Sequence, residues 1–200
     1  MLNHDKNHQW FDLIWLLTKR ELTSKYKGSY LGAVWLILNP IFTVIMFTVL
    51  FSVVFKARWG GIEDSISYGV LVYAGLTIHT FFIDTLSRSS NCITDNGNLV
   101  KKVIFPLITL PTVITLSSLI QLLISISILL LAGLVTGFSL TWTVIFSPLV
   151  LAPIVFITFG LALLLSSLGV YIRDIHQFMP FIGNIFLFTS PILFPIEIMP

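Results

Sequence analysis

Hydrophobic and polar positions are arranged in long blocks along the chain. Asp, Glu, Lys and Arg are absent from residues 31–55, 65–83, 103–172 and 175–196. A helix needs about 20 apolar residues to cross the hydrocarbon core of a bilayer. The pattern therefore predicts five membrane-spanning helices, and the longest block is broken into two at residues 137–141. The predicted spans are 31–55, 68–87, 108–136, 142–168 and 178–196.

The continuity of these apolar runs favours helices over a β-barrel, whose strands alternate over about 10 residues. The predicted fold class is therefore an all-α, polytopic helical membrane protein. Residues 1–30 are expected to form a cytoplasmic N-terminal segment, and residues 31–200 a transmembrane domain.

Composition narrows the class of protein further. Of the 200 residues, 56% are hydrophobic and 10% are charged, whereas about 25% are charged in a typical soluble domain. So few charges cannot cover the surface of a soluble globule of this size. Composition excludes a soluble enzyme, a disordered tail, a nucleic-acid-binding protein and a disulfide scaffold.

The basic residues are distributed unevenly between the two sides of the predicted helices. Nine of the eleven Lys and Arg residues fall in the N-terminal segment or in loops on its side. The other side carries only Lys56 and Arg58, offset by Glu63 and Asp64. Because cytoplasmic loops of membrane proteins are enriched in Lys and Arg, the N-terminus is predicted to be cytoplasmic.

The N-terminal segment contains an amphipathic pattern. Trp10, Leu13, Ile14 and Leu17 recur at helical spacing, and charged residues follow too soon for a signal peptide. We expect an interfacial helix lying on the inner leaflet, with its Lys and Arg residues near anionic headgroups.

Sequence motifs for catalysis are missing. The chain contains no Gly-Lys dipeptide and hence no phosphate-binding P-loop, and it has no dinucleotide or metal-ligand motif. We therefore expect no catalytic residue, no metal and no cofactor bound by this chain. The single cysteine, Cys92, is expected in a cytoplasmic loop as a free thiol.

Ionisable residues inside a predicted span are candidates for function. Asp84 and Arg88 are four residues apart, so they share a helix face and are expected to pair. His79 lies about 140° around the helix from Asp84, so the two form no relay. We expect a neutral His79 that is hydrogen-bonded to a neighbouring helix.

Prolines interrupt the last predicted span. Pro191 and Pro195 each lack a backbone donor, so residues 190–195 cannot form one straight helix. The sequence predicts a bend at the outer face, and it leaves open whether this bend is an outer gate or an ordinary kink.

Three stretches resemble a known family. They are residues 20–40, with Arg20-Glu21, Tyr26-Lys27, Leu31-Gly32, Trp35 and Asn39-Pro40; residues 98–106, ending in Lys101-Lys102 and Phe105-Pro106; and residues 171–175 followed by 190–195. Their order and spacing resemble the permease subunits of bacterial ATP-binding-cassette exporters for polysaccharides such as O-antigen, teichoic acid and capsule. Members of that family typically have a sixth span, so we expect this sequence to be truncated.

The resemblance implies a homodimer that pairs with two copies of a separate ATPase, which would use ATP and Mg. It also implies the bacterial cytoplasmic membrane as the location. The loop from residue 91 to 105 would contact the ATPase, through Asn98, Leu99, Lys101, Lys102 and Phe105. The alternative is that these lysines only anchor the loop on the cytoplasmic side.

The implied substrate is a glycan on a polyprenyl diphosphate. Arg20, Lys25 and Lys27 would meet the diphosphate, unless they only bind anionic lipids. Aromatic residues would line the sugar path, unless they only pack between helices. The expected lining residues are Trp35, Asn39, Phe42, Phe181 and Phe188.

Two competing functions remain open at this point. A membrane enzyme acting on lipid-linked sugars would need a carboxylate pair, and Glu63-Asp64 is the only adjacent acidic pair in the sequence. An ATP-driven exporter permease for a drug or a small lipid is the other.

Overall fold

The computed structural model describes residues 2–51, 65–98, 105–135 and 142–192, and every regular element in these ranges is a helix. In chain order the helices are α1 (Leu2–Ser24), the 3₁₀ turn η1 (Gly32–Val34), α2 (Trp35–Val49), α3 (Ser65–Asp95), α5 (Thr109–Val135), the 3₁₀ turn η3 (Trp142–Phe146), α6 (Ser147–Tyr171) and α7 (Ile175–Thr189). The predicted all-α fold is confirmed.

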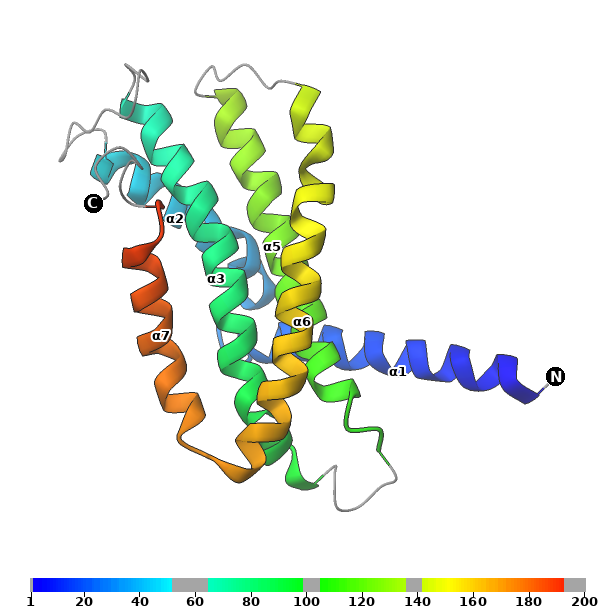
Figure 1. The fold of residues 1–200 in the computed structure, drawn as a ribbon. Coiled ribbons are helices and arrows are strands. Elements are labelled where there is room, and N and C mark those ends of the chain that lie inside the picture. Colours follow the sequence, from blue (N-terminus) through cyan, green and yellow to red (C-terminus); the bar gives the residue numbers. More distant parts are fainter. Residues whose placement is uncertain (1, 52–64, 99–104, 136–141, 193–200) are drawn as a thin grey trace.

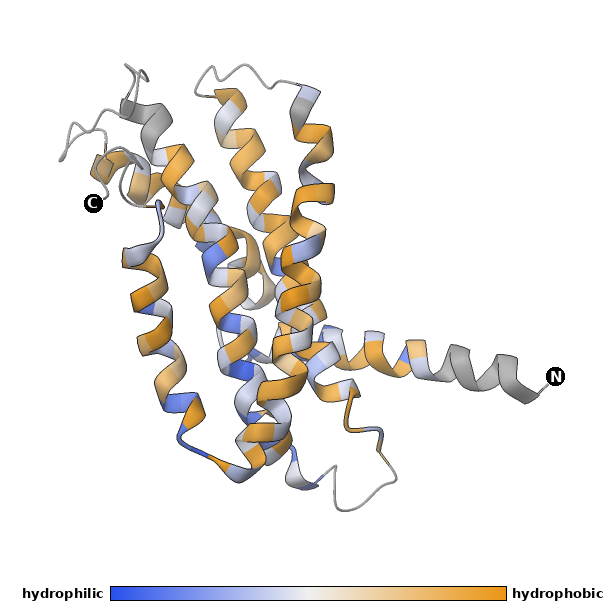
Figure 2. Ribbon diagram, in the orientation of Figure 1, coloured by the Kyte–Doolittle hydropathy of each residue, from blue (hydrophilic) through white to orange (hydrophobic). Residues whose placement is uncertain are grey.

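Helix α3 is the centre of the bundle. It packs against α2, α5, α6 and α7, and α1 extends sideways from the bundle with its contacts on α5 and η1 (Figure 1). Apolar residues dominate α5 and α6, whereas α3 carries several polar segments (Figure 2). The polar groups are thus concentrated on the helix with the most neighbours.

Small residues let α3 approach its neighbours closely. A Cβ atom built on Gly169 of α6 would lie 1.7 Å from the carbonyl oxygen of Ser90, and one on Gly69 would lie 2.5 Å from the Cα of Thr48. Thr85 and Thr158 are fully buried in the same bundle. Membrane helices associate through such small residues because lipid supplies no hydrophobic drive between helices.

Four stretches of the described residues are long and apolar enough to cross a membrane: Gly32–Val49, Gly69–Asp95, Thr109–Val135 and Val144–Tyr171. They match the first four predicted spans, which confirms a polytopic membrane protein. The predicted break at 137–141 lies outside the described residues.

The fifth predicted span differs from its prediction. Its described part is α7, which has 15 residues and is therefore about 22 Å long, short of a bilayer core of about 30 Å. The helix ends before Pro191, where Ser190 is already extended. The prediction that residues 190–195 do not continue a straight helix is confirmed through Ile192, and Pro195 lies outside the described residues.

Cys92 is not in a loop, as the sequence had suggested. Helix α3 continues to Asp95, beyond the predicted end at residue 87. The Cys92 side chain is buried within the bundle and packs with Leu110 and Ile114. The prediction of a free thiol is confirmed, and the predicted loop position is wrong.

The N-terminal segment forms the expected helix, but its predicted apolar face has a different environment. Ile14 on that face is buried because α1 packs against α5. The exposed apolar residues Phe11, Trp15 and Leu16 lie on another side of α1. These three residues, together with Trp10 of the predicted face, are available to a membrane surface.

Candidate functional site

A chain of alternating charges joins α1 to α3. The Arg88 guanidinium donates to Glu21 Oε1 on α1 and, through Nη1, to Asp84 Oδ2 at 3.1 Å on its own helix. Lys25, just after α1, places Nζ 3.3 Å from the same Asp84 oxygen. The predicted Asp84–Arg88 pair is confirmed, and it belongs to a group of two acids and two bases whose charges cancel.

Helix α5 completes this network with uncharged groups. The Ser118 hydroxyl donates to Asp84 Oδ2 at 3.2 Å, and Gln121 Oε1 accepts from Lys25 Nζ at 3.4 Å. Asp84 Oδ2 is therefore the shared acceptor of donors from α3, α5 and the end of α1. Charges inside a membrane protein are stable only when paired in this way.

Burial affects the titration of Lys25. Its side chain is only 26% exposed, and loss of hydration lowers the pKa of its ammonium below the usual value. The Asp84 carboxylate raises the pKa and offsets part of this decrease, whereas Arg88 adds to it.

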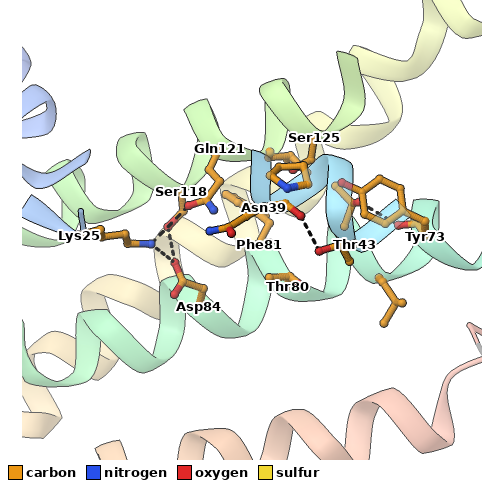
Figure 3. A pocket seen from close by; sticks show the side chains of 14 residues that line it. Lys25, Asn39, Thr43, Tyr73, Thr80, Phe81, Asp84, Ser118, Gln121 and Ser125 are labelled. Atoms are coloured by element: carbon orange, nitrogen blue, oxygen red, sulfur yellow. Dashed lines mark hydrogen bonds and ion pairs between the residues drawn. The ribbon is translucent and has the colours of Figure 1, made fainter. Parts of the chain in front are cut away.

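A polar cavity of about 180 Å³ lies beside this network, between α2, α3 and α5 (Figure 3). Polar side chains follow one face of each helix at helical spacing. They are Tyr73, Thr77, Thr80 and Asp84 on α3, Ser118, Gln121 and Ser125 on α5, and Asn39 and Thr43 on α2, with Lys25 beside them. The cavity thus brings polar side chains of three candidate membrane-spanning helices together.

This cavity was not predicted from the sequence, although the spacing of polar residues on one helix indicated it. Ser118, Gln121 and Ser125 recur at spacings of three and four within an otherwise apolar helix, which marks a polar helix face. What the sequence did not indicate was that three helices would bring such faces together.

His79 has the environment that the sequence suggested. Its Nε2 lies 2.9 Å from the carbonyl oxygen of Gly183 on α7. The predicted hydrogen bond to a neighbouring helix is confirmed.

The residues expected to contact the ATPase are only partly described. Asn98 is exposed, and Leu99, Lys101 and Lys102 lie outside the described residues. Phe105 is half-buried and packs on the cluster of Cys92, Leu110 and Ile114. Its aromatic ring therefore already has neighbours within this chain.

The three expected headgroup residues do not share one site. Lys25 points into the polar cavity, whereas Arg20 lines a second cavity of about 260 Å³ between α1, α5 and the C-terminal part of α3. Lys27 is exposed in the turn after α1. The role of each remains a prediction.

The expected sugar-path residues lie on two helices that have no contact with each other in the described part of one chain. Asn39 lines the polar cavity, and the Trp35 indole donates to Ser29 Oγ at 2.9 Å. Phe42, Phe181 and Phe188 are exposed. Pro191 of the expected outer gate is exposed in the turn after α7.

A known protein family matches most of this chain. Residues 12–200 match the family described as ABC-2 type transporter. The chain belongs to the ABC-2 type transporter family. This match covers all four candidate spans and the polar cavity between α2, α3 and α5.

Curated relatives extend along nearly the whole chain. It is 28% identical over 190 residues to the O-antigen export system permease protein RfbA of Myxococcus xanthus, covering 95% of this chain and 71% of that protein. Two proteins of the same name from Klebsiella pneumoniae are 26% and 24% identical, with the same coverage. The chain is thus a multi-pass membrane protein of the ABC-2 type that resembles permeases.

Proposed function

We propose that this chain is the membrane-spanning subunit of an ATP-driven exporter that moves a lipid-linked polysaccharide out of the cytoplasm. The observation that carries the proposal is the match to permeases named for O-antigen export over 95% of the chain. A permease has to provide a path through the bilayer, and the bundle around α3 supplies membrane-spanning helices for one.

The energy source in this proposal is a separate ATPase. The sequence has no phosphate-binding loop and therefore no known means of cradling ATP. Two ATPase copies, using ATP and Mg, would bind the cytoplasmic side of the permease, where residues 91–105 join α3 to α5. No cofactor is assigned to the permease itself.

The charged end of the bundle supports the proposed orientation in a bacterial cytoplasmic membrane. The His176 ring lies 3.1 Å from the carbonyl oxygen of Ser87, so the α6–α7 turn with Arg173 lies close to the C-terminal part of α3 that carries Arg88. Basic residues gathered at one end favour the cytoplasm for that end and for the N-terminus.

The exposed face of α7 supports a homodimer. Gln177 and Asn184 are exposed there, on the same face as Phe181 and Phe188. Amide side chains facing lipid are costly because hydrocarbon offers no hydrogen-bond partner. A second copy across a water-filled path would cover this face, and the two phenylalanines would contact the glycan there.

The lipid diphosphate is assigned to Arg20 and Lys27, on the cytoplasmic side of the bundle. Both are exposed, whereas Lys25 is occupied by Asp84 and Gln121. The local positive potential near the inner leaflet favours an anionic headgroup at this position.

Copurification tests the proposal. An ATPase subunit from the native host should copurify with this chain, and Lys101→Gln with Lys102→Gln should reduce both the copurified ATPase and glycan export. The matched control is Lys56→Gln with Arg58→Gln on the opposite side of the membrane, which should change neither. Unchanged ATPase binding in the first variant would refute the assigned contact, and export without any ATPase would refute the function.

A further inference from the structure

Three hydroxyl groups open on the polar cavity without a hydrogen-bond partner among the described residues: those of Tyr73, Thr80 and Ser125. Tyr73 is only 3% exposed and Ser125 only 9%. Each belongs to a helix that crosses the membrane. An unpaired hydroxyl in hydrocarbon is costly, so these groups favour a polar occupant, either water or a ligand, in the cavity.

The shape of the cavity admits more than isolated water molecules. Its volume of about 180 Å³ corresponds to about six waters at about 30 Å³ each, a space that a single monosaccharide unit also fits. From Asp84 to Tyr73 the lining extends eleven residues along α3, or about 17 Å. Asn39 of α2 and Thr80 of α3 are both exposed, which places an opening between these two helices.

The charges beside the cavity favour a neutral occupant. Lys25 and Asp84 neutralise each other, and Arg88 is paired with Glu21 and Asp84. An ionic ligand would find no net opposite charge there. A neutral polyol would find donors and acceptors together, as the Gln121 side chain carries both types.

The rings of Tyr73 and Phe81 also line the cavity. Binding sites commonly combine apolar or aromatic surface with a few polar groups that fix orientation. A pyranose ring has the same two-sided character, with C–H faces and hydroxyl edges.

We propose that the cavity between α2, α3 and α5 binds one neutral sugar unit of the exported glycan within a single protomer. This inference rests on the proposed export function and adds a sugar-binding site that the exposed aromatic residues of α2 and α7 do not provide. Tyr73, Thr80 and Ser125 donate to or accept from the sugar hydroxyls.

Hydroxyl removal is the first test, made in the complete permease–ATPase complex. Tyr73→Phe combined with Ser125→Ala should lower the rate of glycan export at least about fivefold, the effect of one lost hydrogen bond, with the same amount of copurified ATPase. Ser127→Ala is the matched control, because Ser127 is exposed on the same helix and bonds to the carbonyl of Leu123. An unchanged export rate in the double variant overturns the inference.

Site-directed labelling is the second test and separates sugar from water. In a Cys92→Ser background, Ser125→Cys should react with a hydrophilic, membrane-impermeant maleimide. The probe is the cells' own glycan with its lipid removed by mild acid, and it should slow this labelling severalfold. Labelling that the glycan does not slow means a cavity holding water only, and absence of labelling means a closed cavity; either result overturns the inference.

The two proposals fail in different ways. If the unaltered chain binds no ATPase and exports no glycan, the proposed function is wrong. If the unaltered complex exports glycan while both cavity tests give the contrary result, only the sugar site is wrong.

Discussion

Lys25 and Arg88 donate to the same carboxylate oxygen, Oδ2 of Asp84, at 3.3 and 3.1 Å. Lys25 follows α1 and Arg88 lies on α3, so this oxygen links the N-terminal segment to the centre of the bundle, beside the separate ion pair of Arg88 with Glu21 on α1. The contribution of the Asp84 carboxylate to the free energy of unfolding can be measured.

Asp84→Asn should destabilise the bundle by about 2 kcal/mol. Removing one partner of a buried ion pair costs about 3–5 kcal/mol, and the cost is reduced here because the Asp84 side chain is 33% exposed. The measurement is the midpoint of thermal unfolding in detergent. In a double-mutant cycle with Lys25→Gln, the two effects should be non-additive, and strict additivity would contradict the shared contact.

Lys25 should lose its proton at a lower pH in the folded protein than in the unfolded chain. Burial lowers the pKa of Lys25, so in the interval between its folded and unfolded values the unfolded chain binds more protons. Stability contributed by this group therefore rises with pH across that interval. Reductive methylation with ¹³C and NMR titration of Lys25 in the folded and in the denatured protein gives both pKa values directly.

The same titration has an internal check. Asp84→Asn should lower the pKa of Lys25 further, because the carboxylate is the group that raises it. A rise for Lys25 would show that the ammonium is not held beside Asp84.

Gly169→Ala should destabilise the protein strongly. The added Cβ would lie 1.7 Å from the Ser90 carbonyl oxygen, so α3 and α6 would have to separate, at a cost of about 1–3 kcal/mol or more. Gly160→Ala on the same helix is the control, since nothing lies within 4 Å of its Cβ position. Unfolding midpoints of the two variants, measured side by side, should differ by several degrees.

Cys92 should react slowly with thiol reagents in the native protein. Its side chain is 3% exposed, so a maleimide should label it fully only after denaturation. The variant Lys27→Cys in a Cys92→Ser background should react at once, because Lys27 is exposed. Rapid labelling of Cys92 in the native protein would contradict its buried position in α3 and indicate an exposed loop.

Charge gaps were sufficient to predict the first four membrane helices, because lipid excludes unpaired charges along a whole span. The same criterion ended the second span at residue 87, just before Arg88, whereas α3 continues to Asp95. Glu21 and Asp84 neutralise Arg88, and partners so distant in sequence were not recognisable from the charge pattern. The Asp84–Arg88 pair itself was predictable because it is local.

Periodicity predicted α1 as a helix but not the environment of its faces. The stripe that contains Ile14 packs on α5, and Phe11 and Trp15 are left exposed. Both stripes are apolar, so only the packed structure distinguishes them. The polar cavity is a similar case: the faces of α3 and α5 had a sequence signal, and their juxtaposition with α2 depends on helix packing.

The position of Glu21 and Lys25 has a mechanical consequence. Both residues lie near the bundle end of α1, and each is tied to α3 through Arg88 or Asp84. A force that moves the N-terminal end of α1 up or down would make this helix pivot about its ion pairs with α3. Any such tilt has to break two ion pairs together or rotate the central helix with it.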